Sequence, residues 1–284
     1  MAPGLPDPPY IVAGAAGGPL VMYLVTPLRN ALTLAALDSN KGVLRVYKDV
    51  FRGGLAAGFS GGQYMASAAV PGFLVLGPVF HMYKDLCGGS SLAAVGLTAV
   101  SESLIFYGSE TLNAQKAYNA DAAKRGAKVI ANLQSQYSPF GSGLGLHVAR
   151  NALAMSGMRV FSRPCQDMIG SLSPAMPQSS RAVAGDFVAN VVVSAISAPL
   201  HQVYGFTVTG RLAPDAAAPG MSLLEASRNF LRAQYLTPAG GLSAAAGRDI
   251  FLRVVYNASI FTIYGAIERG LVANWPSSLT WKKA

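Results

Sequence analysis

Six long apolar stretches alternate with shorter polar segments along the chain. Each stretch is long enough for a helix that crosses a hydrocarbon core of ~30 Å, which requires about 20 helical residues. Several stretches contain a glycine, a proline or a lone charge, which favours helices packed around a polar interior over isolated spans in lipid. The pattern predicts an all-α membrane protein with six transmembrane helices. The stretches cover approximately residues 10–35, 54–86, 92–118, 142–170, 182–210 and 241–274.

The polar segments are of two kinds. Those after the first, third and fifth stretches are long and basic, whereas the two connections near 88–91 and 171–181 are short and nearly uncharged. Six helices would place all three basic segments on one side of the membrane, which the positive-inside rule assigns to the interior compartment. The basic segments are residues 38–53, 119–138 and 211–237.

Two local patterns make more specific predictions. Ser222 and Glu225 have the spacing of a capping box, and the apolar positions that follow predict a short helix on the membrane surface. Gly54, Gly58 and Gly62 recur every four residues on the second stretch, which predicts a face of small residues where helix backbones approach closely.

Composition supports a membrane protein over a soluble one. Apolar residues make up 51% of the 284 residues and charged residues 12%, against roughly 25% charged in soluble domains. The net charge of +9 gathers in the short segments between apolar runs, where it suits an anionic membrane surface better than nucleic acid. We therefore expect no nucleic-acid partner.

Nothing in the chain indicates an enzyme. No nucleophile–base pair, carboxylate pair or metal-ligand cluster is evident, so we expect no catalytic residue, no metal and no cofactor. The two cysteines, Cys87 and Cys165, have no metal-like spacing. The segment 1–10 lacks a basic region before an apolar core, so we expect sorting by internal signals rather than a cleaved address.

The ends of the stretches recur three times. The first and fifth share a Pro-Leu pair, in Val25-Thr-Pro27-Leu and Ser197-Ala-Pro199-Leu, and Gly108 occupies the matching position of the third. The even stretches end alike, as Phe80-His-Met-Tyr83, Phe161-Ser-Arg-Pro164 and Phe261-Thr-Ile-Tyr264. Repetition at fixed intervals predicts three related units, with boundaries at 1–91, 92–181 and 182–284.

The order of these motifs resembles the mitochondrial carrier family over nearly the whole chain. In that family each odd helix ends in Pro-x-Asp/Glu-x-x-Lys/Arg, a surface helix follows, and the even helix ends in an aromatic motif. Glu110-Thr111, with Arg150 and Arg159-Val-Phe161 further on, is most similar to the citrate (tricarboxylate) carrier branch. The resemblance implies three pseudo-symmetric repeats with short matrix surface helices, in the mitochondrial inner membrane. It also implies cardiolipin contact near Tyr47-Lys48, although Asp49 replaces the glycine of the family pattern.

The charged gates of the family are missing. The acid positions of the matrix gate hold Arg29, Glu110 and His201, and the base positions hold Leu32, Asn113 and Tyr204. None of the three family salt bridges can form as written. The even ends, at Tyr83, Pro164 and Tyr264, lack the acid of the opposite gate, although Asp85, Asp167 and Glu268 lie nearby and could make other pairs. Losing both gates removes the family's means of alternating access.

Two functions fit these observations. In the first, a degenerate carrier has become a structural accessory subunit of an inner-membrane respiratory or ATP synthase complex, with lipids and the other subunits as its partners. In the second, a divergent carrier moves an anionic metabolite, a carboxylate or nucleotide, through a cavity lined by arginines, because intramembrane cations are functional candidates. The candidate cavity residues are Arg150, Arg159, Arg248 and Arg253.

Overall fold

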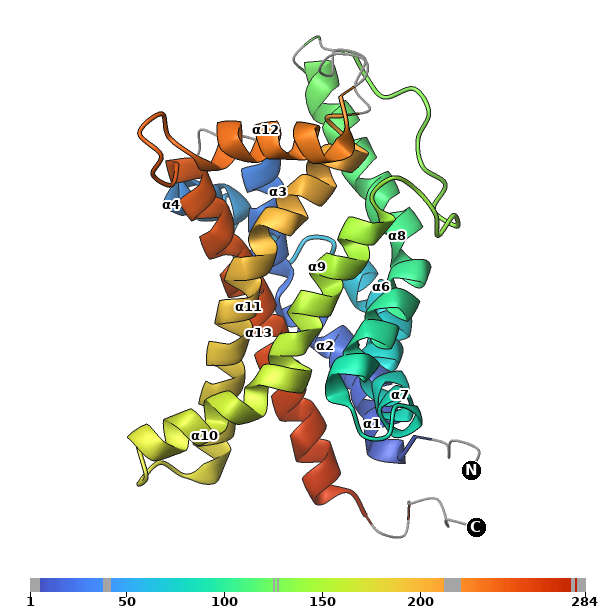
Figure 1. Ribbon diagram of the computed structural model, residues 1–284, viewed down its shortest axis with the longest axis vertical. Helices are drawn as coiled ribbons and strands as arrows, with labels where there is room; N and C mark the ends of the chain where they lie inside the picture. The colour runs from blue at the N-terminus through green and yellow to red at the C-terminus, as the bar shows by residue number, and fades with distance from the viewer. Residues whose placement is uncertain are drawn as a thin grey trace.

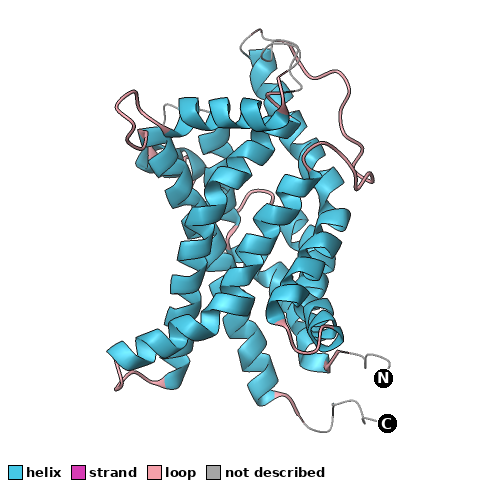
Figure 2. Ribbon diagram, in the orientation of Figure 1, coloured by secondary structure: helices cyan, strands magenta, loops and turns pink. Residues whose placement is uncertain are grey.

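The computed structural model describes residues 6–37, 42–124, 126, 128–211, 221–276 and 279. It is 79% helical and has no strand among the described residues, so the all-α prediction is confirmed (Figure 2). Four helices in this part of the chain are long and apolar enough to cross a membrane, or five if one bent pair counts as a single span. Length and composition therefore support several spans, but fewer than the six predicted.

The long helices form a closed ring in chain order. α2 (Gly18–Leu24) packs on α6 (Gly62–Leu74), α7 (Phe80–Leu86) on α8 (Ser91–Lys124), and α8 on α9 (Leu144–Ser156). α9 packs on α11 (Gln178–Val208), α11 on α13 (Ala244–Asn274), and α13 closes the ring on α3 (Thr26–Leu37). Two shorter helices, α4 (Val43–Val50) and α12 (Leu223–Tyr235), lie at the upper end, opposite the two chain ends (Figure 1).

The first two predicted helices are broken. The first stretch comprises α1 (Pro8–Val12), α2 and α3, with a bend of 57° beside Val25 and Pro27. The second begins as α5 (Leu55–Gly58), and a turn with a left-handed residue at Gly61 (φ 80°) precedes α6. The prediction that Gly54, Gly58 and Gly62 share a helix face is therefore wrong, because no single helix contains all three.

The other four stretches are helical close to their predicted bounds. α8 runs on to Lys124, and α11 remains one helix through Pro199. The fourth stretch is a continuous helical run from Leu144 to Leu172, made of α9, η3 (Gly157–Phe161) and α10 (Ser162–Leu172). It is absent from the candidate spans found among the described residues, and it carries charges at Arg150, Arg159, Arg163 and Asp167.

Three π-helical turns interrupt the long helices: η1 (Ala13–Gly17), η2 (Val75–Val79) and η3. A π turn adds a residue to the helical repeat and rotates the side chains beyond it, and such turns are frequent at functional sites. η1 contacts η2, and Arg159 of η3 reaches the carbonyl of Leu76 in η2. The three turns therefore gather in one region of the bundle.

The basic segments differ from one another. The first contains α4 and the third contains α12. In the second, 119–138, residues 119–124 belong to the end of α8, and the described residues 128–138 hold only turns, bends and irregular chain. The short helix predicted within 211–237 is confirmed, since Ser222 caps α12 by accepting a hydrogen bond from Glu225 N at 3.2 Å. Lys41 and Arg125, assigned to these basic segments, lie outside the described residues.

Replacing Ser222 with alanine should loosen the first turn of α12. An N-cap serine contributes about 0.5–2 kcal/mol, and the loss should speed hydrogen exchange at the first-turn amides. Hydrogen-exchange mass spectrometry measures this directly. Arg228→Ala, at an exposed position on the same helix, should leave exchange nearly unchanged, and equal acceleration by both variants would contradict the capping role.

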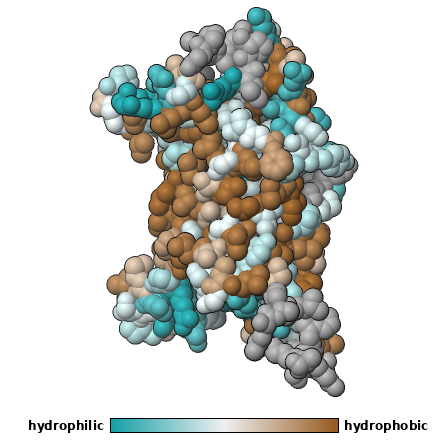
Figure 3. Space-filling model, turned by 45° about the vertical axis from the view of Figure 1, so that its right-hand side comes forward, coloured by the Kyte–Doolittle hydropathy of each residue, from teal (hydrophilic) through white to brown (hydrophobic). Residues whose placement is uncertain are grey.

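Side chains of the apolar stretches form both the buried core and much of the outer surface. The largest buried cluster joins side chains from α2, α6, α8 and α13, among them Val21, Phe73, Val95 and Tyr264. Apolar residues also cover the middle of the molecular face in Figure 3, while hydrophilic residues collect toward its two ends. An apolar band between polar ends is the surface that a bilayer requires.

Candidate functional site

A buried ionic cluster joins three helices in the upper half of the bundle. Arg150 on α9 donates from Nη2 to Glu110 Oε2 on α8 at 2.8 Å, and from Nη1 to His201 Nδ1 on α11 at 3.1 Å. Arginine can only donate, so His201 accepts through Nδ1. The Arg150 side chain is 4% exposed and that of Glu110 is 38% exposed, so the guanidinium is buried while the carboxylate is partly open to solvent.

A second layer of polar residues orients this cluster. His147 lies one turn before Arg150, and its Nε2 is 3.2 Å from Glu110 Oε2. Asn151 Oδ1 accepts a hydrogen bond from Arg150 Nε at 3.0 Å. Asn151 Nδ2 donates to Glu102 and also lies 3.2 Å from His147 Nδ1. Because an amide nitrogen donates, His147 Nδ1 accepts and its Nε2–H donates to Glu110. Two of the hydrogen-bond partners of Arg150, Glu110 and Asn151, are thereby each held by a further side chain.

Tyr204 completes the upper cluster. Its ring lies under Arg150, with the guanidinium carbon 4.9 Å from the ring centroid, a distance at which cation–π attraction operates. Its hydroxyl is 2.8 Å from Thr111 Oγ1 on α8. Tyr204 therefore occupies a base position of the family gate but contributes a ring and a hydroxyl instead of a charge.

A second ion pair crosses the lower half of the bundle. Arg159 in η3 donates from Nη1 to Glu268 Oε1 at 2.5 Å and from Nη2 to Oε2 at 2.7 Å. The two side chains are 7% and 9% exposed. Glu268 on α13 thus makes the kind of alternative pair expected of an acid near the even ends, whereas Asp85 and Asp167 lie at exposed positions. A bidentate pair this deeply buried holds η3 and α13 in one fixed relation.

The π turns position Arg159 in this pair. In η2 the amide of Phe80 donates to Val75 O and Gly77 O rather than to Leu76 O, and Arg159 Nη2 donates to Leu76 O at 2.9 Å. The Arg159 guanidinium also lies 4.6 Å from the Phe80 ring centroid. Arg159 therefore connects the second, fourth and sixth helical stretches.

A further ion pair supports the lower half. Asp186 on α11 is fully buried and accepts from Arg269 Nη1 on α13 at 2.5 Å. Ser162 also donates to Asp186, and Gln166 Nε2 does so at 3.1 Å. The lower half thus has two separate ionic links to α13.

The other two candidate arginines, Arg248 and Arg253, both lie on α13. Arg248 pairs with its neighbour Asp249 at 2.7 Å, and Gln202 on α11 donates to the same carboxylate at 3.2 Å. Arg253 is 8% exposed and within electrostatic range of Arg150 and Glu110, but its Nε has no hydrogen-bond partner among the described residues. Asn257 Nδ2, one turn further along α13, is also buried without a described partner.

The structure gathers some of the sequence-predicted gate positions and separates others. Glu110, His201 and Tyr204 meet around Arg150, although no base was expected beside them. Asn113 lies at an exposed position on α8, and Leu32 packs on the apolar cluster beneath α4. The remaining gate positions are Pro27 and Gly108, which are buried, and Arg29 and Pro199, which are half-buried.

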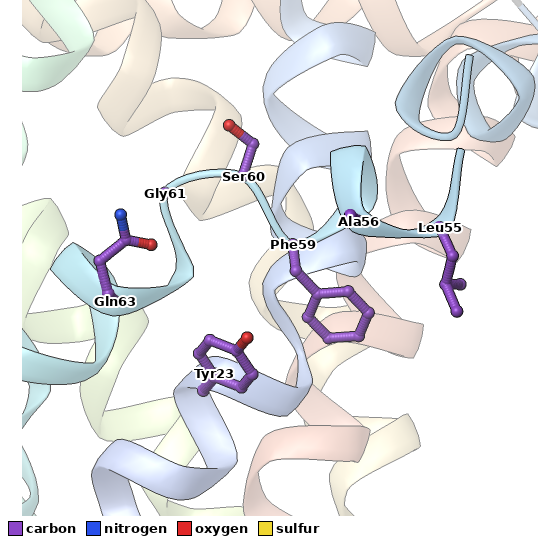
Figure 4. A pocket seen from close by; sticks show the side chains of 7 residues that line it. All are labelled: Tyr23, Leu55, Ala56, Phe59, Ser60, Gly61 and Gln63. Carbon is purple, nitrogen blue, oxygen red and sulfur yellow. The ribbon is translucent and has the colours of Figure 1, made fainter. Parts of the chain in front are cut away.

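A pocket of about 600 Å³ opens where the first two helices break. Tyr23, at the end of α2, faces Phe59 in the turn between α5 and α6, with Ser60 and Gln63 beside it (Figure 4). The Tyr23 and Phe59 rings stack at 5.6 Å. None of the candidate cavity arginines lines this pocket, so it is separate from the ionic clusters.

Sequence reasoning missed several residues of these clusters: Glu102, His147, Asn151, Asp186 and Arg269. A usable signal was present for two of them, because Glu102 and Asp186 are acids within apolar stretches, and intramembrane charges are rarely without a partner. His147 precedes Arg150 by three residues, about one helical turn, and Asn151 follows it directly. Nothing in the sequence alone indicates that the helix face with His147 and Arg150 meets Glu110.

The fold and the clusters describe a helical protein with several helices able to span a membrane and with ion pairs buried between them. No protein-family model matches the chain, and no curated protein matches it either.

Proposed function

We propose that the chain is a divergent carrier-type protein of the mitochondrial inner membrane that serves as a structural accessory subunit of a respiratory or ATP synthase complex. In this proposal six helices span the membrane in three related repeats. The interior ion pairs maintain one shape and do not gate a solute path. Inner-membrane lipids, including cardiolipin near Tyr47-Lys48, and the neighbouring subunits are its partners.

The observation that carries this proposal is that ion pairs join the helices in the upper half and in the lower half of the bundle in the same structure. The Glu110–Arg150–His201 cluster joins α8, α9 and α11, while the Arg159–Glu268 pair joins η3 and α13. A transporter closes one side while the other opens, so it needs links that alternate in stability. Buried ion pairs are costly to break singly, and two permanent sets favour a bundle that stays in one state.

The arrangement of the long helices also supports the proposal. Six helical segments pack in chain order as a ring, which is the order that three helix pairs produce. α4 and α12 lie at the same end, after the first and fifth segments (Figure 1). The fourth segment, Leu144–Leu172, is long enough to span, and two of its charges, Arg150 and Arg159, are paired within the ring.

Native electrophoresis of mitochondrial membranes in mild detergent tests the proposal. We expect the chain to migrate with a large respiratory or ATP synthase complex in fixed stoichiometry. Arg150→Met should lower its amount in that complex, because the bundle would lose its upper link. Migration solely near 29.5 kDa plus detergent would contradict a structural subunit.

One observation favours the alternative, transport of an anionic metabolite. Arg253 Nε and Asn257 Nδ2 are buried on one face of α13 without partners among the described residues, and buried donors are normally satisfied. A carboxylate or phosphate oxygen could accept from both. Uptake of labelled citrate or nucleotide by vesicles holding the purified chain, abolished by Arg253→Gln and retained in the exposed-site control Arg228→Ala, would establish transport in place of the structural role.

A further inference from the structure

The loop at residues 129–140 connects α8 to α9 and takes the place that a surface helix holds in the other two basic segments. It descends beside α8 to the start of α9 (Figure 1). Its anchors show the direction, since Ile130 bonds to Asn119, Gln134 bonds to Gln115, and residues 135–138 lie against Gly108. The loop therefore runs antiparallel to α8 toward its middle.

The loop lies beside the middle of a candidate membrane span. Gly108 lies eight residues inside the end of the candidate span Ser91–Lys116, about 12 Å below that end at 1.5 Å per residue. A Cβ on Gly108 would lie 2.6–2.8 Å from the carbonyl oxygens of Ser135, Gln136 and Ser138. Irregular backbone is therefore in direct contact with a helix that is apolar enough to span a membrane.

Side chains of α8 and of the loop bond several of the loop's backbone groups. Asn119 accepts from Ile130 N at 2.8 Å and donates to Ile130 O at 2.9 Å. Gln115 Oε1 accepts from Gln134 N at 2.7 Å, and Gln134 Nε2 donates to Phe140 O at 3.0 Å and to Ser138 O at 3.3 Å. In water such backbone groups would be solvated without help, whereas near the hydrocarbon each unsatisfied group costs several kcal/mol.

The exposed side chains of the loop include two aromatic and two aliphatic ones, beside the polar Asn132, Ser135 and Gln136. Tyr137 is 85% exposed and Phe140 is 68% exposed, and Val129 and Leu133 are exposed as well. Aromatic residues are enriched at membrane–water interfaces because their rings suit the headgroup level. The loop thus combines contact with a candidate span, a partly bonded backbone and two strongly exposed aromatic rings.

We propose that the 129–140 loop is a membrane anchor that seats Tyr137 and Phe140 in the lipid interface, at the boundary between headgroups and acyl chains. The loop would fix the height and rotation of α8 and α9 in the bilayer without a surface helix. This proposal is independent of whether the chain is a structural subunit or a transporter, because both would need the bundle oriented in the membrane.

Depth-dependent fluorescence quenching tests the anchor on the purified full chain in phosphatidylcholine vesicles. Trp275→Phe and Trp281→Phe remove the native tryptophans, and Tyr137→Trp then provides the only reporter. We expect emission shifted to shorter wavelength, with loss of most fluorescence when the lipid is brominated near the headgroup end of the acyl chain. Bromine near the methyl end should quench less.

Ala239→Trp in the same background is the matched control, since Ala239 lies in an exposed turn after α12 and should emit at long wavelength with little quenching. Phe140→Trp gives a second reporter if the Tyr137 variant does not fold. Absence of lipid quenching at both positions would overturn the proposal, and the emission would then identify the surroundings: long wavelength means water, and short wavelength means contact with protein.

Discussion

Arg159→Met should destabilise the bundle more than any other single substitution considered. The Glu268 carboxylate, whose side chain is 9% exposed, would stay buried without the arginine that donates to both of its oxygens. Leu76 O would also lose its 2.9 Å hydrogen bond from Arg159. Removing one partner of a buried ion pair costs about 3–5 kcal/mol. SDS titration of the purified chain in mixed micelles should show this loss in the free energy of unfolding.

The double variant Arg159→Met with Glu268→Leu separates a buried charge from lost packing. Replacing both partners with apolar groups of similar volume is often neutral or stabilising, so the double variant should recover most of the stability. If it is as unstable as Arg159→Met, the loss comes from packing around Phe80 and Leu76 and not from the stranded carboxylate.

Gly108→Ala should be the second most damaging change. A methyl group there would approach three backbone carbonyl oxygens to within 2.8 Å, and backbone cannot rotate away as a side-chain end can. Overpacking of this kind costs about 1–3 kcal/mol. We expect a lower free energy of unfolding and faster trypsin cleavage after Lys128, because the 129–140 loop would be displaced from α8.

Gly96→Ala is the control on the same helix. Nothing lies within 4 Å of a Cβ on Gly96, and alanine is favoured over glycine in a helix by up to about 1 kcal/mol. This variant should therefore be as stable as the parent chain or more stable. Equal destabilisation by both substitutions would show that glycine is needed for helix flexibility and not for seating the loop.

Two positions where the chain differs from the carrier pattern have a structural explanation. The position that holds proline in the family pattern holds Gly108 here, and the structure gives glycine a packing role, since the loop backbone occupies the space of a side chain. The resemblance implies a base at Leu32, Asn113 or Tyr204, whereas the cation that contacts Glu110 and His201 in the structure is Arg150 on α9. Neither substitution could be interpreted from motif positions alone.

The sequence by itself determined the helical class and the approximate course of the long helices. Apolar stretches of 20 or more residues allow few alternatives, because each must bury its backbone hydrogen bonds within a helix. The capped surface helix after Ser222 was also predictable, since an N-cap and its bonded amide lie three residues apart. Such features depend on near neighbours in the chain, and periodicity and spacing record them directly.

Only the tertiary structure decided which charges meet. Arg159 and Glu268 are 109 residues apart in sequence, and Arg150 and His201 are 51 apart. Whether such residues face each other depends on the rotation of each helix about its axis, which the π turns at Val75–Val79 and Gly157–Phe161 change. The breaks at Val25 and Gly61 likewise depend on how the first two helices pack, so a hydropathy pattern that treats each stretch as one uniform helix cannot predict them.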